Sequence, residues 1–288
     1  MWNPFNRNTI SNSSASKRSL QLITQKGMPF AYVEAYKALR TNLNFLSGSG
    51  DVHAFVVTST VPEEAKSNVS VNLALALTES GKKVVLVDCD LRKPVLHRYL
   101  KAGHNLKGVS NVLSRQVALS DALVEPKGIP NLTFLPAGTT PPNPSELLSQ
   151  PQMQEMVDTL RGSYDFVILD APPISMVTDA AVIGRIVDGA LFVVRSKYAS
   201  TDAVKTALEK LQDAGVKVLG AVLTRYDAKK SLKRSDYGYG YYYYNSNYSY
   251  GTPPPDSISE SAAEKSCLTS KKRHNGKEKH SVHTEDET

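Results

Sequence analysis

The stretch Val84-Val-Leu-Val-Asp88-Cys-Asp90-Leu-Arg92-Lys-Pro94 joins a continuous apolar run to two carboxylates. An uninterrupted apolar run of this length is typical of a strand buried on both faces, as in a parallel sheet covered by helices. Asp88 and Asp90 follow at the strand end and share one side if the strand extends that far, because side chains alternate. Ligands of parallel sheets bind at the carboxyl ends of the strands. The stretch therefore predicts a fold class and a polar site together.

Apolar runs on either side of this stretch repeat the alternation of strand and helix. Strands are predicted over residues 54–58, 83–88, 132–136, 166–170, 190–194 and 216–223. Helices are predicted over residues 31–45, 67–80, 144–160, 178–187 and 201–214. This alternation favours an α/β fold with a doubly wound, mostly parallel sheet and helices on both faces.

The composition changes along the chain and divides it into four parts. Residues 1–28, rich in Asn, Ser and Thr, are predicted to be a flexible arm, and residues 29–228 to form the main domain with its N-terminal helix. Residues 229–252 hold a basic turn and a tyrosine cluster, and residues 253–288 are a polar tail, predicted to be disordered. The cluster holds eight of the 14 tyrosines of the chain: Tyr237, Tyr239, Tyr241, Tyr242, Tyr243, Tyr244, Tyr248 and Tyr250.

The overall composition excludes several classes of protein. The chain has 288 residues, 41% of them hydrophobic, but no apolar run approaches the ~20 residues of a membrane-spanning helix. Its start, Met1-Trp-Asn-Pro4, lacks the regions of a signal peptide, and its two cysteines agree with a reducing cytosol. We therefore expect a cytoplasmic protein. No aromatic platform is interleaved with a basic stripe in the main domain, so nucleic-acid binding is not expected.

A second polar segment, Ser59-Thr-Val-Pro-Glu-Glu-Ala-Lys-Ser67, lies between the first strand and the helix after it. A phosphate-binding loop needs this context, because backbone N–H groups and a helix N-terminus face the anion. Lys66 would reach the terminal phosphates, and Ser67 would help to hold Mg²⁺. Thr60 and Ala65 replace the two usual glycines, and alanine in a left-handed conformation costs ~1–2 kcal/mol. Taken alone, the segment is equally well explained as a charged turn.

A third carboxylate strengthens the prediction of a nucleotide site. Asp170 ends the strand Phe166-Val-Ile-Leu-Asp170, at the same edge of the predicted sheet as Asp88 and Asp90. Each aspartate alone is as well explained by a helix cap or a turn, but Mg²⁺ bound to phosphates takes a few hard oxygen ligands. The set therefore predicts a site for ATP and Mg²⁺. Its predicted nucleotide-binding residues are Pro62, Glu63, Glu64, Ala65, Lys66, Ser67 and Asn68.

These segments resemble a known family, the bacterial tyrosine kinases of capsular and exopolysaccharide biosynthesis, which are relatives of the deviant-P-loop ATPases of cell division and plasmid partition. Residues 88–94 resemble the Walker A′ motif of that family, and residues 167–173 resemble its Walker B motif. Residues 108–113 and 141–148 are also similar to family segments, and the tyrosine cluster resembles the family hallmark. The resemblance covers about residues 30–250 and implies a P-loop NTPase-like fold.

The resemblance implies an ATP-dependent protein tyrosine autokinase that phosphorylates the clustered tyrosines of a neighbouring subunit. By the family pattern Lys66 contacts phosphate, Asp90 orients or deprotonates the tyrosine hydroxyl, and Arg92 stabilises transferred charge. A solvated basic residue explains Arg92 nearly as well. The implied Mg²⁺ ligands are Ser67, Asp88 and Asp170, of which Asp170 acts through water. The implied catalytic residues are Lys66, Asp88, Asp90, Asp170 and Arg92.

The resemblance also implies partners. Glu34, Lys37 and Arg40 resemble an oligomerisation motif that forms a ring, although lysine replaces the middle arginine and loses its fork geometry. Glu34 and Lys37 are also explained as an ordinary pair on one helix. The family further implies a membrane adaptor of the polysaccharide co-polymerase type, which activates the kinase and recruits it to the inner face of the membrane, and a cognate tyrosine phosphatase.

Two departures from the family pattern keep other functions open. Ala65 stands where glycine is expected, and Thr224 stands where the related ATPases usually have an asparagine that reads adenine. One alternative is an ATPase like the division-site proteins, whose tail is a docking segment rather than a phosphate acceptor. Another alternative is a non-catalytic scaffold whose loop no longer binds ATP.

Overall fold

A computed structural model describes residues 21–48, 52–103 and 105–226, so the tyrosine cluster lies outside the described residues. Six parallel strands form one sheet in the order β3-β2-β4-β1-β5-β6. The strands are β1 (Ala54–Ser59), β2 (Val84–Asp88), β3 (Leu132–Leu135), β4 (Phe166–Asp170), β5 (Ala190–Arg195) and β6 (Val218–Thr224). This arrangement confirms the prediction of a doubly wound α/β fold.

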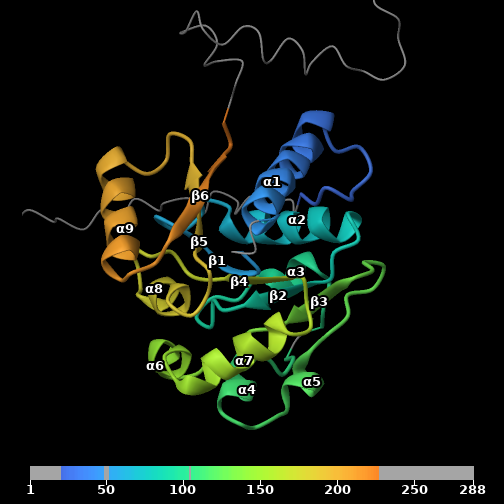
Figure 1. Cartoon of the computed structure of the whole chain (residues 1–288), viewed down its shortest axis with the longest axis vertical. Coiled ribbons are helices and arrows are strands. Elements are labelled where there is room, and N and C mark those ends of the chain that lie inside the picture. The colour runs from blue at the N-terminus through green and yellow to red at the C-terminus, as the bar shows by residue number, and fades with distance from the viewer. Residues whose placement is uncertain (1–20, 49–51, 104, 227–288) are drawn as a thin grey trace, which may run out of the picture. The chain divides into compact units, whose positions relative to one another are not determined.

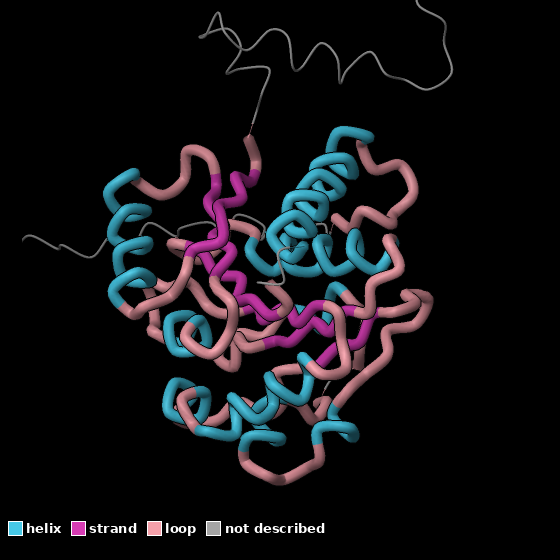
Figure 2. The backbone as a smooth tube through the Cα atoms, viewed as in Figure 1, coloured by secondary structure: helices cyan, strands magenta, loops and turns pink. Residues whose placement is uncertain are grey.

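Helices cover both faces of the sheet, and the strands run between the two helical layers (Figures 1 and 2). The helices of one face are α1 (Phe30–Gly48), α2 (Lys66–Glu79) and α3 (Leu96–Tyr99). Those of the other face are α4 (Val109–Leu113), α5 (Leu119–Ala122), α6 (Pro144–Leu148), α7 (Pro151–Arg161), α8 (Asp179–Gly184) and α9 (Thr201–Asp213).

Alternation along the buried strands divides the core into two clusters, one on each face of the sheet. In β1, Phe55 and Val57 pack toward the face of α1 and α2, whereas Val56 packs toward the opposite face. Every residue of β1, β2 and β4 is buried, as their continuous apolar runs predict. Helix α2 lies between the sheet and α1, so 11 of its residues are buried, among them the polar Ser67, Ser70, Asn72 and Thr78.

The structure corrects several predicted helices. Residues 144–160 form two helices, α6 and α7, rather than one. The reason is Pro151, which stands at the start of α7 and disfavours helical backbone at Gln150, whose φ is −73° and ψ 152°. The helix predicted over 178–187 is shorter and spans Asp179–Gly184. Helices α3, α4 and α5 were not predicted, because four or five residues are too few to show a helical period.

Residues 21–28, part of the predicted N-terminal arm, lie against the main domain. Ile23 is buried, and its backbone N–H donates to Asn72 Oδ1 at 2.8 Å. The carbonyl of Gln21 accepts hydrogen bonds from Asn68 and Asn72 of α2, each at 2.9 Å. Residues 21–23 of the predicted arm therefore pack against α2, and the boundary at residue 28 stays a prediction. Over the described residues, no helix has the length and apolar character needed to cross a membrane.

Candidate functional site

The carboxyl ends of three central strands bring the predicted site residues together. Strand β4 lies between β1 and β2, and the register pairs Asp88 directly with Asp170. Strand β1 ends at Ser59 beside them and continues into the loop that leads to α2. Strand β2 ends at Asp88, so Asp90 reaches the site from the following turn rather than from the strand. The predicted convergence of the three segments is therefore confirmed.

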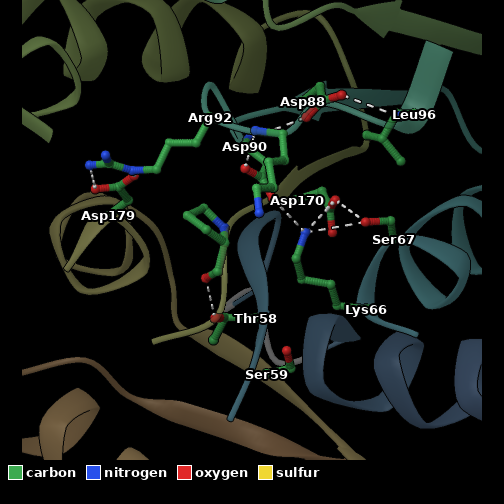
Figure 3. Close-up of polar contacts among 12 residues, drawn as sticks. Thr58, Ser59, Lys66, Ser67, Asp88, Asp90, Arg92, Leu96, Asp170 and Asp179 are labelled. Carbon is green, nitrogen blue, oxygen red and sulfur yellow. Dashed lines mark hydrogen bonds and ion pairs between the residues drawn. The ribbon is translucent and has the colours of Figure 1, made fainter. Parts of the chain in front are cut away.

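Lys66 and Asp170 form the centre of the site (Figure 3). The Lys66 ammonium lies 3.1 Å from Asp170 Oδ2 and 3.3 Å from Asp90 Oδ2. Ser67 donates to Asp170 Oδ2 at 2.6 Å, and Ser70, one turn later, donates to Asp170 Oδ1 at 2.9 Å. Asp170 is fully buried, so these donors replace the water that its charge would otherwise require. Ser70 was not among the predicted site residues.

Burial and mutual repulsion set the charges of this cluster. Burial alone would lower the pKa of Lys66, but the carboxylates of Asp170, Asp90 and Asp88 raise it above its ordinary value. Burial also raises the pKa of Asp88 to about 8, and the charge of Asp170 adds to this effect against the attraction of Lys66. A cation beside Asp88 would favour its ionised form. The cluster therefore suits a ligand that brings positive charge with it.

The loop before Lys66 has an unusual backbone. Glu63 and Ala65 both have positive φ, 71° and 72°, in the left-handed region that favours glycine. Ala65 is the residue that precedes α2, so the structure places a left-handed residue where a glycine is usual. Each such residue costs ~1–2 kcal/mol in general. Thr60, in the place of the first glycine, is buried, and its hydroxyl has no partner among the described residues.

Two predicted residues point away from Lys66. Arg92 contacts Asp179 at 3.1 Å through Nε and Ser145 at 2.8 Å through Nη2, and Figure 3 shows its side chain turned away from Asp170. Asn68 accepts hydrogen bonds from Tyr32 and Tyr36 of α1 at 3.0 and 3.2 Å, so it faces α1 rather than the loop. The catalytic role of Arg92 and the nucleotide-binding role of Asn68 stay predictions.

The three residues of the predicted oligomerisation motif lie on α1 and make contacts within the chain. Lys37 donates to Glu34 at 2.7 Å, three residues earlier on the same helix. Arg40 donates to the carbonyl of Ala76 on α2 at 2.8 Å. These contacts fit the local explanation of the motif, and its role in assembly stays a prediction.

The donor set of the site fits a nucleotide with Mg²⁺. In the part of the chain that the structure describes, no three His, Cys, Asp or Glu side chains are arranged to hold a metal ion by themselves. Mg²⁺ at a phosphate site is bound by only one or two carboxylates together with phosphates and waters. Ser67, Asp88 and Asp170 offer hard oxygen atoms beside the helix start, where backbone N–H groups suit phosphate.

Comparison with known proteins identifies the family. The profile of an AAA domain matches residues 64–218. Tyrosine-protein kinase YwqD of Bacillus subtilis is 37% identical over 205 residues, which cover 71% of this chain and 84% of that protein. The crystal structure of the chimerical protein CapA2B2 is 35% identical with a TM-score of 0.64 and covers 69% of this chain and 86% of that one.

A further solved structure extends the comparison. The kinase domain of Escherichia coli tyrosine kinase ETK is 33% identical with a TM-score of 0.64, and it covers 73% of this chain and 80% of that one. Each of these proteins covers about two thirds or more of the chain, and the domain profile, residues 64–218, includes Lys66 and the three aspartates. The chain belongs to the family of bacterial tyrosine-protein kinases.

Proposed function

We propose that the protein is an ATP- and Mg²⁺-dependent tyrosine autokinase that regulates the synthesis and export of capsular polysaccharide or exopolysaccharide. The observation that carries the proposal is the buried cluster of Lys66, Ser67 and Asp170 beside Asp88 and Asp90, at the edge of the sheet where such folds bind ligands. The names of the similar proteins, tyrosine-protein kinases, favour a kinase over an ATPase with a docking tail and over a scaffold.

The residues of the cluster divide the work of phosphoryl transfer. The ammonium group of Lys66 can leave Asp170 and Asp90 and contact phosphate oxygens when a nucleotide binds. Ser67, Asp88 and Asp170 would hold Mg²⁺, which when bound neutralises phosphate charge. The N-terminus of α2 would face the phosphates with its N–H groups.

Asp90 is the candidate for handling the acceptor tyrosine. Its carboxylate lies 3.3 Å from Lys66 and is nearly buried, and its other oxygen accepts the backbone N–H of Lys93 at 3.0 Å. We propose that Asp90 accepts the phenolic proton while the tyrosine oxygen bonds to the γ-phosphorus and the bond to ADP breaks. The proposed acceptors, residues 237–250, lie outside the described residues, and they would come from a neighbouring subunit of a ring.

The proposal includes partners that act through protein surfaces. Glu34, Lys37 and Arg40 on α1 would contribute to ring assembly. A membrane adaptor of the polysaccharide co-polymerase type would recruit the kinase to the inner face of the membrane, and a tyrosine phosphatase would reverse the modification. Nucleic acid has no place in this function.

Mass spectrometry of the full chain after incubation with Mg-ATP and the adaptor tests the proposal. We expect phosphate on tyrosines of residues 237–250, and none on the Lys66→Met variant. Phosphate that depends on Lys66 but persists after deletion of residues 237–250 would contradict the proposed acceptors. ATP hydrolysis without phosphotyrosine would support the ATPase alternative, and an absence of nucleotide binding would support the scaffold.

A further inference from the structure

Glu64 occupies an unexpected place for an acidic residue in a phosphate loop. Its side chain is buried, with 1% of the residue exposed. One carboxylate oxygen accepts the backbone N–H of Val61 at 2.9 Å, and the other accepts the backbone N–H of Arg195 at 3.2 Å. The carboxylate thus connects the start of the loop to Arg195 at the end of β5, which lies 131 residues after Glu64.

The backbone of the same residue is held from a third direction. The Thr224 hydroxyl, at the end of β6, donates to the Glu64 carbonyl at 2.9 Å. The Arg195 guanidinium donates to the neighbouring carbonyl of Glu63 at 3.4 Å. The ends of β5 and β6 therefore fix the middle of the loop through both its side chain and its main chain.

These contacts surround the two left-handed residues of the loop. Glu63 and Ala65 flank Glu64. Both have a positive φ, and neither is glycine, the residue that adopts a positive φ without steric cost. A sparsely populated backbone conformation persists only where the surrounding structure holds it in place. The hydrogen bonds of Glu64 are the contacts that can hold the peptide between these two residues.

We infer that Glu64 is a positioning residue that keeps the glycine-free loop in its phosphate-binding shape, with Arg195 and Thr224 as its supports. A direct role on the ligand is disfavoured, because a carboxylate that faced phosphate oxygens would repel them. The inference rests on the proposed nucleotide site and deepens it. It also gives Thr224 a role on the loop backbone, in the place where related ATPases read adenine.

Titration of the full-length protein with a fluorescent ADP analogue and Mg²⁺ tests this inference. We expect Glu64→Gln to weaken binding by about tenfold, because an amide cannot accept both backbone N–H groups. Glu155→Gln, on the exposed surface of α7, is the matched control and should bind like the unmodified protein. Binding by Glu64→Gln within about twofold of the control would overturn the inference.

Rescue by glycine separates positioning from a general loss of structure. In a Glu63→Gly/Ala65→Gly background the strain is gone, so the same Glu64→Gln change should weaken binding by about threefold or less. An undiminished loss in that background would show that Glu64 does not act by holding the left-handed residues.

Thr224→Val provides a second, milder variant if Glu64→Gln does not fold. It removes one hydroxyl at nearly constant shape, and we expect about threefold weaker binding with an unchanged melting temperature. Unaltered binding by Thr224→Val would contradict the support assigned to Thr224. If the unmodified protein fails to bind Mg-ADP, the proposed function fails first, and this inference falls with it. That outcome differs from equal binding by variant and control.

Discussion

Two pairs of a basic residue with a buried aspartate lie at the carboxyl edge of the sheet, and they differ in their surroundings. Lys66 contacts Asp170 and Arg92 contacts Asp179, each at 3.1 Å, and both aspartate side chains are fully buried. Lys66, however, also lies 3.3 Å from a second carboxylate, that of Asp90, whereas Arg92 also donates to the hydroxyl of Ser145. The same distance between cation and carboxylate thus occurs in two different environments.

The two cations differ in how easily each can exchange its carboxylate partner for a phosphate. An ammonium is a compact charge on a flexible stem, so Lys66 can exchange a carboxylate for a phosphate without changing the backbone. A guanidinium binds through a planar fork, and Arg92 uses its fork to join the turn after β2 to the starts of α6 and α8. We therefore expect the first pair to govern activity and the second to govern stability.

Replacement of Lys66 should give the largest effect. We expect Lys66→Met to lower phosphotyrosine formation by about a thousandfold, because it removes the charge that moves to phosphate. Urea unfolding measures stability separately, because the change also leaves Asp170 and Asp90 without their buried cation. Lys82→Met, which breaks an exposed pair with Asp165 at 4.0 Å, is the control. Activity of Lys66→Met near that of the control would remove Lys66 from the mechanism.

Replacement of Asp179 should have the opposite profile. Asp179→Ala leaves Arg92 and Ser145 without their shared acceptor, and we expect it to lower the free energy of unfolding by about 2–3 kcal/mol. Binding of Mg-ADP to the folded protein should change by less than about threefold. Urea unfolding, with Asp213→Ala on the exposed end of α9 as control, measures the first quantity. A large loss of turnover without a loss of stability would assign this pair to catalysis, as the family resemblance implies for Arg92.

A third pair, at the amino edge of the sheet, extends the comparison to pH. Burial raises the pKa of Asp188, but backbone N–H groups of Ala54 and His53 and the Arg161 guanidinium outweigh it, so the pKa lies below its ordinary value. A lowered pKa adds stability above the unfolded pKa, near 4, and that stability is lost as pH falls through the folded value.

Asp188→Asn should therefore lower the free energy of unfolding at pH 7 by about 1 kcal/mol, with a smaller difference at about pH 3. Urea unfolding at both pH values measures the difference, and Asp121→Asn on the surface of α5 is the control. A difference that grows as the pH falls would reverse the expected sign.

Relief of strain in the loop should give the smallest effect. Ala65→Gly removes a left-handed alanine, and we expect Mg-ADP to bind about threefold more tightly. Arg115→Gly relieves another left-handed residue, which follows α4, and should leave binding unchanged. Weaker binding by Ala65→Gly would mean that the alanine favours Mg-ADP binding by restricting the backbone of the loop.

The sequence predicted the sheet well because its strands are continuous apolar runs between helices. It also predicted that Lys66, Ser67, Asp88 and Asp170 converge, because the alternating pattern indicates a parallel sheet and ligands of such sheets bind at the carboxyl ends of the strands. It did not separate α6 from α7, although Pro151 is a visible signal for a new helix start. Short helices such as α4 contain too few residues to show a helical period in their hydrophobic pattern.

The remaining site contacts depend on tertiary neighbours that no local pattern reveals. Arg195 and Thr224 meet Glu64 only because β5 and β6 follow β1 in the sheet. Asp179 gave a weak signal, as an acid in the first turn of a helix, but its partner Arg92 lies 87 residues earlier. Ser70 follows Lys66 by one helical turn, and that spacing could have suggested it.

The burial of α2 on both sides has a consequence for motion. A helix held between the sheet and α1 cannot tilt without opening the core cluster on that face of the sheet, so its amides should exchange with solvent deuterium only through global unfolding. The loop over residues 60–65 is held instead by hydrogen bonds, those of Glu64 with Val61, Arg195 and Thr224. Its amides can exchange when these few bonds open, so Mg-ADP should slow exchange in the loop while leaving the middle of α2 unchanged. The helix is then a fixed support for a small, strained segment whose shape depends on a few hydrogen bonds.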